Sequence, residues 1–261
     1  MAFVKAGGCR LEYEWVGMGP ADGPAVVMLH EGLGSVAMWR DFPLQVSKAT
    51  GLRVLVYSRE GYGRSDPVTD LPRPADFMHR EAQVVLPELL TALSVRRPIL
   101  LGYSDGGSIA LIYAGSRLDP APEGVIAIAP HVLAEPRTLV SIAKARVLWE
   151  ETDLRGRLAR YHDDPDGAFY TWNLSWLMPE FRTWSIEDLL PSITAPTTVI
   201  QGTEDEYGSI AQPQAIEHRA PGHVRTAMLK GCGHTPHRDQ PAQTLSAIVD
   251  HIKATTTASA A

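Results

Sequence analysis

Three side chains, at three separate places in the chain, have the types and spacing needed for nucleophilic catalysis, and Ser104 is the first of them. It lies in the pattern Gly102-x-Ser104-x-Gly106, between an apolar run at 98–103 that is typical of a buried strand and a helical pattern from 108 to about 118. A serine on such a tight strand-to-helix turn needs small neighbours two residues away, because a Cβ there would strike the crossing backbone. The pattern therefore predicts a strained turn that lifts the serine hydroxyl above the sheet, where it can act as a nucleophile. The alternative is a glycine-rich turn that only packs a helix on a sheet.

A serine hydroxyl needs a base and an acid that orients the base, and both types of residue follow later strand-like runs. In an open α/β sheet, working residues lie on loops that leave the carboxyl ends of strands. Asp205 is one of three consecutive acids after one run, with Glu204 as its nearest rival. His234 stands between a glycine and a threonine after the next run, with His237 as the competing histidine. We predict the set Ser104, Asp205 and His234. A metal site is disfavoured because no close paired-ligand motif accompanies the histidines.

The order of elements indicates an α/β core with one insertion. Loose alternation over 9–16 predicts an edge strand, with a second strand directly after it. Strand-like and helical runs then alternate, which predicts a core made of 1–130 and 191–253. Residues 131–190 carry no strand-like run but hold several tryptophans and arginines, so we expect a helical cap. The small, polar segment 254–261 is expected to be a disordered tail.

Composition limits the class of protein and its partners. The formal charge of −6 argues against nucleic acid or an anionic membrane as the main partner. Cys9 and Cys232 form neither a disulfide framework nor a metal pattern. The first residues lack the apolar core of a signal peptide, and no apolar run approaches membrane-spanning length. We therefore expect a cytoplasmic protein that acts on a small molecule. Tryptophan-rich caps can pair between subunits, so a homo-oligomer is compatible with the sequence.

The order Ser104, Asp205, His234 and the glycines around these residues resemble the α/β-hydrolase superfamily, specifically its cap-bearing serine hydrolases, over about residues 10–253. Segment 61–65, Gly-Tyr-Gly-Arg-Ser, also looks like the one that follows the fourth strand in this family. The resemblance implies a mostly parallel eight-stranded sheet with helices on both faces and a helical cap insertion. It also implies that Ser104 is the nucleophile, His234 the base and Asp205 the orienting acid. No metal or organic cofactor is implied.

The loop after the third strand departs from the family pattern. The family usually has His-Gly there, and the next residue donates an N–H group to the oxyanion hole. Here Glu31 takes the usual glycine place after His30, so Gly32 aligns with the donor and the N–H of Asp105 is the second donor. A shift by one residue would give the role to Leu33. Glu31 is either a surface residue or a carboxylate that reaches the pocket rim. Each oxyanion donor is worth roughly 3 kcal/mol.

The cap is expected to supply the substrate pocket. Candidate pocket residues are Leu33, Trp149, Trp172 and Trp176, which suggest an apolar cavity. The alternative is that the tryptophans only hold the cap to the core. The cap arginines that could recognise a substrate carboxylate are Arg146, Arg155, Arg157 and Arg160. Most of them are expected to be solvated charges on helix faces.

Three functional hypotheses follow. The first is a carboxylesterase that cleaves a small, largely apolar ester through an acyl-enzyme. The second is a carbon–carbon bond hydrolase of aromatic ring-cleavage products, of the 2-hydroxy-6-oxo-dienoate type, which needs a cationic cap residue near the substrate carboxylate. The third is a non-catalytic binding module, which is disfavoured because all three members of the triad are present.

Overall fold

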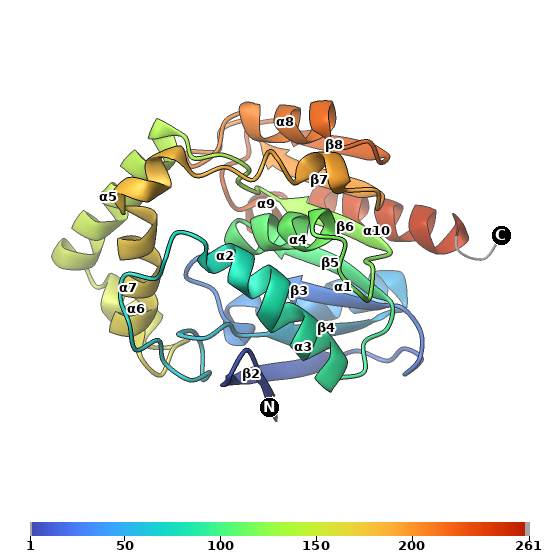
Figure 1. Cartoon of the computed structure of the whole chain (residues 1–261), viewed down its shortest axis with the longest axis horizontal. Coiled ribbons are helices and arrows are strands. Elements are labelled where there is room, and N and C mark those ends of the chain that lie inside the picture. Colours follow the sequence, from blue (N-terminus) through green and yellow to red (C-terminus); the bar gives the residue numbers. More distant parts are fainter. Residues whose placement is uncertain (1, 259–261) are drawn as a thin grey trace.

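One eight-stranded sheet forms the centre of the protein in the computed structural model, which describes residues 2–258 (Figure 1). Its strands are β1 Ala2–Ala6, β2 Cys9–Val16, β3 Ala25–Leu29, β4 Arg53–Tyr57, β5 Pro98–Tyr103, β6 Gly124–Ile128, β7 Thr197–Gly202 and β8 Val224–Leu229. Their order is β1-β2-β4-β3-β5-β6-β7-β8. Strands β4, β3, β5, β6, β7 and β8 run parallel to one another. Strand β2 pairs antiparallel with both of its neighbours, β1 and β4. The predicted mostly parallel eight-stranded sheet is confirmed.

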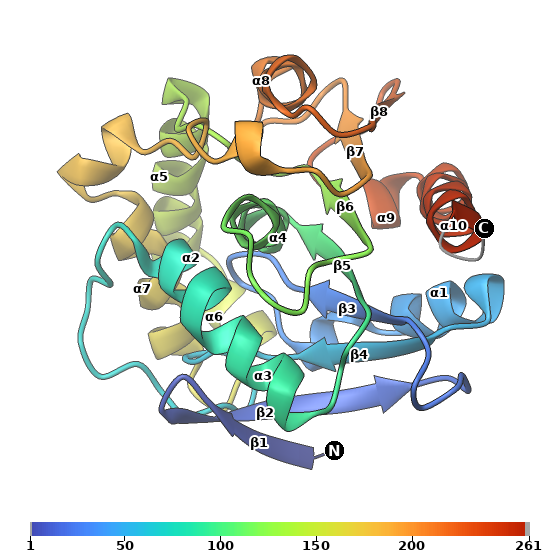
Figure 2. The same ribbon diagram turned by 45° about the vertical axis from the view of Figure 1, so that its right-hand side comes forward.

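Helices cover both faces of the sheet (Figure 2). The α-helices of the described residues are α1 Phe42–Thr50, α2 Phe77–Arg80, α3 Leu86–Ala92, α4 Asp105–Gly115, α5 Pro136–Glu151, α6 Leu154–Leu158, α7 Pro165–Trp176, α8 Ala211–Arg219, α9 Pro236–Asp239 and α10 Pro241–Ala258. Helices α1 and α10 pack on one face, and α3, α4 and α8 pack on the other. Strand β3 shows the consequence: Val27 and Leu29 belong to one apolar cluster, while Val26 and Met28 belong to the opposite one. Because both faces are covered, the central strands are continuous apolar runs.

Segment 131–190 lies between β6 and β7 in sequence and holds helices α5, α6 and α7, which gather to one side of the sheet (Figures 1 and 2). Within it, the Trp149 ring stacks on Phe169 with centroids 4.2 Å apart. His162 connects it to the core, because its Nε2 lies 3.0 Å from the Leu33 carbonyl oxygen and its Nδ1 accepts from the Gly63 N–H at 2.9 Å. The segment is therefore fixed over the loops that follow β3 and β4.

The predicted edge of the sheet is wrong in one respect. The strand next to β2 precedes it, and the residues after β2 form a loop. Gly7 and Gly8 have φ of +64° and +85°, and they reverse the chain between the paired residues Ala6 and Cys9. Two glycines with positive φ are a favoured two-residue hairpin turn, and this turn makes β1 the edge strand.

The predicted disordered tail is also wrong over 254–258, because α10 continues to Ala258. Thr255 is buried, and its hydroxyl donates to the His251 carbonyl at 3.1 Å. Burial of Thr255 against the core offsets the weak helix propensity of threonine. Residues 259–261 lie outside the described residues.

Candidate active site

Ser104 stands on a strained turn between β5 and α4. Its φ of 53° and ψ of −118° lie where residues with a side chain rarely occur. A Cβ on Gly102 would collide with the Gly106 carbonyl, and a Cβ on Gly106 would collide with the Leu29 carbonyl of β3. Glycine at both positions therefore lets the chain turn tightly enough to hold this serine at the carboxyl edge of the sheet.

Three hydrogen-bonding groups meet at this edge. His234 Nε2 lies 3.0 Å from Ser104 Oγ, and His234 Nδ1 lies 2.9 and 2.8 Å from the two carboxylate oxygens of Asp205. The three residues follow β5, β8 and β7, whose carboxyl ends lie at one edge because β5, β6, β7 and β8 are consecutive parallel strands. When Nδ1 carries the proton, its N–H donates a hydrogen bond to the Asp205 carboxylate, and Nε2 is free to accept the proton of the serine hydroxyl. The structure thus brings the three sequence-predicted residues into one chain of hydrogen bonds.

Asp205 is buried and held by several donors. Its carboxylate accepts from the Gln201 side-chain amide at 2.6 Å and from the N–H groups of Tyr207 and Gly208 at 2.8 and 3.0 Å. Burial alone would raise the pKa of Asp205, but the hydrogen bonds from His234, Gly208 and Tyr207 outweigh it, so the pKa lies below its usual value. The carboxylate is therefore ionised and fixed in orientation at neutral pH.

The other acid and histidines near this edge do not take part in the hydrogen bonds between Ser104, His234 and Asp205. Glu204 is exposed, and the His237 ring packs edge-on against Tyr103 with centroids 4.8 Å apart. His131, which sequence reasoning passed over, is buried with its ring 5.8 Å from that of His234. Burial, followed by the neighbouring His234, lowers the pKa of His131 to about 3. His131 is thus neutral at neutral pH.

The loop after β3 orients the peptide group between Glu31 and Gly32. The Glu31 carbonyl oxygen lies 3.0 Å from Arg59 Nη2 and 2.6 Å from His30 Nδ1. In a trans peptide the C=O and N–H groups point in opposite directions, so the Gly32 N–H points away from Arg59. Gly32 lines the same cavity as Ser104. This geometry favours Gly32 as an oxyanion-hole donor.

Asp105 begins α4, so its N–H has no acceptor within the helix and is available as the second donor. Its side chain is buried and turned to other partners: the Trp176 indole N–H donates to Oδ1 at 3.2 Å, and Arg59 Nη2 lies 3.8 Å from Oδ2. Arg59 is itself fully buried and donates to the His30 carbonyl at 2.7 Å. One cation therefore joins the turn after β5 to the loop after β3. The sequence carries no signal for a buried Arg59.

An open cavity of about 320 Å³ surrounds Ser104 and His234. Its walls are mainly apolar and come from both the core and segment 131–190. The lining residues of most chemical interest are Glu31, Leu33, Met38, Tyr103, Leu154, Leu158, Trp172, Glu206 and Tyr207. An apolar pocket with a few polar groups at the reacting centre is typical of a small-molecule site.

The structure divides the predicted pocket residues. Leu33 and Trp172 line the cavity. Trp149 and Trp176 do not, and their prediction is corrected. Trp149 is instead stacked on Phe169, and Trp176 turns its N–H to the buried carboxylate of Asp105. Both rings stabilise the packing of segment 131–190, as the alternative reading of the tryptophans expected.

Several lining residues were missed by sequence reasoning. The Tyr207 ring lies 4.6 Å from that of His234, and the Glu206 carboxylate accepts from the His234 N–H at 3.3 Å. Both follow Asp205 directly in the chain, and this proximity was a usable signal. Leu154 and Leu158 have i, i+4 spacing, which places them on one face of α6.

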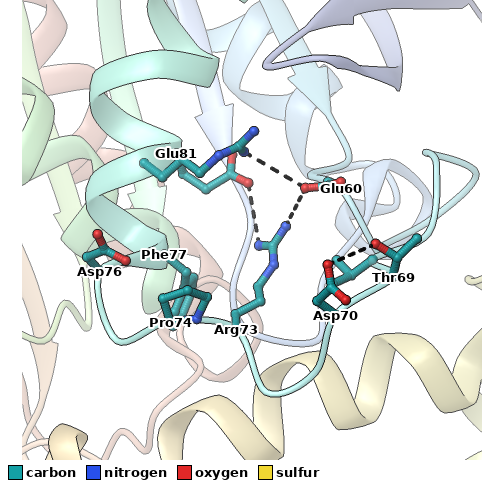
Figure 3. A pocket seen from close by; sticks show the side chains of 10 residues that line it. Glu60, Thr69, Asp70, Arg73, Pro74, Asp76, Phe77 and Glu81 are labelled. Carbon is teal, nitrogen blue, oxygen red and sulfur yellow. Dashed lines mark hydrogen bonds and ion pairs between the residues drawn. The ribbon is translucent and has the colours of Figure 1, made fainter.

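A second cavity of about 250 Å³ lies beside α2 (Figure 3). Arg73 Nη2 is 2.8 Å from the Glu60 carboxylate, and Arg73 Nη1 is 3.5 Å from that of the buried Glu81 (Figure 3). Arg80 also pairs with Glu60, at 3.9 Å. These charges compensate one another, and none of the residues lining this cavity lines the Ser104 cavity.

Comparison with known proteins identifies the family of this chain. The family model described as "Alpha/beta hydrolase family" matches residues 26–247. The chain belongs to the alpha/beta hydrolase family. Its family and its relatives together identify it as a hydrolase.

The relatives of this alpha/beta hydrolase carry several activities. The chain is 28% identical to the putative carbamate hydrolase RutD of Pseudomonas savastanoi pv. phaseolicola over 258 residues, covering 90% of this chain and 96% of the relative. It is 37% identical to human serine hydrolase BPHL over 115 residues, which cover 43% of this chain and only 37% of that protein. The enol-lactonase structure from Burkholderia xenovorans LB400 superimposes with a TM-score of 0.74 at 20% identity, covering 97% of this chain and 100% of that one. No helix among residues 2–258 has the length and hydropathy needed to cross a membrane.

Proposed function

We propose that this hydrolase is a serine hydrolase that cleaves carboxylic esters beneath a cap formed by residues 131–190. The single observation that carries the proposal is the chain of hydrogen bonds from Ser104 Oγ through His234 to Asp205. A neutral imidazole hydrogen-bonded to both a hydroxyl and an ionised carboxylate is arranged to activate that hydroxyl.

In the first half of the reaction, Ser104 Oγ attacks the ester carbonyl carbon and its proton passes to His234 Nε2. The tetrahedral oxyanion accepts hydrogen bonds from the N–H groups of Gly32 and Asp105. The intermediate collapses, the carbon–oxygen bond to the alcohol breaks, and His234 gives its proton to the departing alkoxide. Asp205 stabilises the imidazolium throughout.

In the second half, water attacks the acyl-enzyme carbonyl and gives a proton to His234 Nε2. Collapse of the second tetrahedral intermediate releases the carboxylic acid, and the proton returns to Ser104 Oγ. The apolar cavity accommodates the acyl or alcohol part of the ester.

The alternative is cleavage of a carbon–carbon bond in a ring-cleavage product. That reaction needs a cationic cap residue beside the substrate carboxylate. Within the described part of the chain, no lysine or arginine lines the Ser104 cavity. Arg146 pairs with Glu150 and Arg155 pairs with Asp166, so both are engaged elsewhere. The Ser104 cavity itself therefore offers no cation to such a carboxylate, whereas two arginines of segment 131–190, Arg157 and Arg160, line an adjoining cavity.

The test compares wild type with Ser104→Ala on p-nitrophenyl esters from acetate to decanoate and on a 2-hydroxy-6-oxo-dienoate. We expect ester turnover that is lost in the alanine variant, with a chain-length optimum that reflects the cavity. Fast turnover of the dienoate with weak ester turnover would favour the alternative. Full activity of Ser104→Ala would refute the proposed nucleophile.

A further inference from the structure

A third cavity, of about 330 Å³, adjoins the Ser104 cavity. We call it the arginine pocket, because four arginines line it: Arg40, Arg157, Arg160 and Arg238. Its remaining lining residues are Met38, Leu154, Leu158 and Tyr161. Met38, Leu154 and Leu158 line both cavities, so the two spaces share an apolar boundary. Arg157 and Arg160 belong to segment 131–190, which is proposed as the cap. Arg40 and Arg238 belong to the core.

The four cations have no matching anions. No aspartate or glutamate lines the arginine pocket, and none of the four arginines forms an ion pair with an acidic residue of the described chain. Arg40 lies 3.4 Å from the Tyr161 hydroxyl, and Arg238 donates to the Met38 carbonyl at 3.0 Å. Arg155, two residues before Arg157, makes the contrast clear, because it forms a close ion pair with Asp166.

All four side chains are exposed, so water screens their mutual repulsion, and an anion placed between them would gain a favourable interaction with each. The arrangement is unexpected in a chain with a formal charge of −6, which has acidic residues to spare. Arg238 also acts on the Ser104 cavity, because its charge opposes the rise that burial causes in the pKa of the Glu31 carboxyl. The guanidinium group is the side chain best suited to bind a carboxylate or a phosphate through paired hydrogen bonds.

We propose that the arginine pocket binds an anionic group, a carboxylate or a phosphate, at the end of the substrate remote from the scissile ester. The apolar part of the substrate then crosses Met38, Leu154 and Leu158, and the reacting carbonyl lies at Ser104. This inference rests on the proposed ester hydrolysis and narrows it to esters that carry a negative charge at the far end of an apolar spacer.

The test uses matched pairs of esters that differ only in this terminal charge. One series consists of mono-p-nitrophenyl esters of dicarboxylic acids with four to ten carbons, each paired with its terminal methyl ester. A second series consists of acetate esters of ω-hydroxy acids and of their terminal phosphate analogues, each paired with the neutral amide or alcohol. The two series place the charge on the acyl and on the alcohol side, and the second separates carboxylate from phosphate.

For wild type we expect kcat/KM for the anionic ester to exceed that of its neutral partner about 10-fold or more at low salt in at least one series. This preference should decline as ionic strength rises, because exposed charges are screened. Arg157→Gln/Arg160→Gln should bring the ratio of anionic to neutral kcat/KM close to one. The matched control is Arg155→Gln, on the same helix as Arg157, which should keep the wild-type ratio because Arg155 already pairs with Asp166.

Two results would overturn the inference while leaving ester hydrolysis intact. One is equal wild-type turnover of anionic and neutral esters in both series. The other is an anionic preference that the double variant retains. If wild type cleaves neither member of any pair, the proposed function itself fails, and the inference fails with it.

Discussion

Arg59→Met should both destabilise the protein and slow its reaction, because one buried cation serves two purposes. The Arg59 side chain has no solvent exposure, and the Asp105 side chain 3.8 Å away is 2% exposed. Removing one member of a buried ion pair leaves the other charge without compensation and costs about 3–5 kcal/mol. The same substitution removes the donors to the His30 and Glu31 carbonyls, which orient the peptide group of Gly32.

Urea denaturation should show the loss of about 3–5 kcal/mol in the free energy of unfolding. At a temperature where the variant remains folded, we expect kcat on a reactive ester to fall about 10-fold or more with little change in KM, because a misoriented oxyanion donor weakens transition-state binding only. Arg59→Met/Asp105→Asn should recover part of the stability, since it removes the uncompensated charge. Asparagine still accepts from the Trp176 indole N–H.

The matched control is Arg73→Met. Arg73 is also nearly buried and ion-paired, with Glu60 and Glu81, but it lies in the second cavity (Figure 3). It should lose stability while kcat of the folded protein stays at the wild-type value. A change of less than 1 kcal/mol in Arg59→Met, or an equal loss of kcat in both variants, would refute the reasoning.

Three further predictions follow from the site and its surroundings. Gly32→Ala should lower kcat/KM about 10-fold or more, because its Cβ would collide with the Trp172 indole; Gly32→Ala/Trp172→Ala should recover part of the loss in the same assay. Asp205→Asn should lower kcat about 10⁴-fold by favouring the wrong histidine tautomer, while thermal unfolding shows that the variant remains folded. His131 and His237 are buried with pKa values of about 3, so the unfolded chain binds more protons below about pH 6.5. Stability should therefore fall from pH 6.5 toward pH 3, by about 2 kcal/mol per histidine at pH 5; equal urea midpoints at pH 7.5 and pH 5 would contradict this.

Much of the site could be predicted from the sequence because each of its main polar residues lies on a loop that follows a strand. The carboxyl ends of parallel strands meet at one edge, so the placement of Ser104, Asp205 and His234 after three strands was enough to bring them together. Gly102 and Gly106 are needed because the strand and the helix meet so tightly here, and this pattern made Ser104 recognisable as a candidate nucleophile. These inferences needed only local sequence and one topological rule.

The remaining features depend on which residues meet across long separations. Trp149 and Trp172 look alike in sequence, yet one stacks on Phe169 and the other lines the cavity. Arg155 and Arg157 are two residues apart, and only the position of Asp166 on the following helix distinguishes the paired arginine from the unpaired one. Such differences arise from the packing of the helices, which no short-range pattern encodes.

The C-terminal end of helix α10 is another feature that the local sequence does not predict. The composition of 254–261 is typical of disorder, but burial of Thr255 against the core extends the helix to Ala258. Propensity is a weak guide where a few tertiary contacts contribute more than the preferences of single residues.

The most direct test of the central claim is the reaction of the protein with a fluorophosphonate probe, followed by intact mass and peptide mapping. The probe needs no knowledge of the substrate, because it reports whether a serine hydroxyl is activated by a base. We predict one adduct per chain, located on Ser104, which is absent in Ser104→Ala and forms far more slowly in His234→Ala. An adduct on another serine, or labelling of Ser104→Ala at the wild-type rate, would contradict the proposed active site.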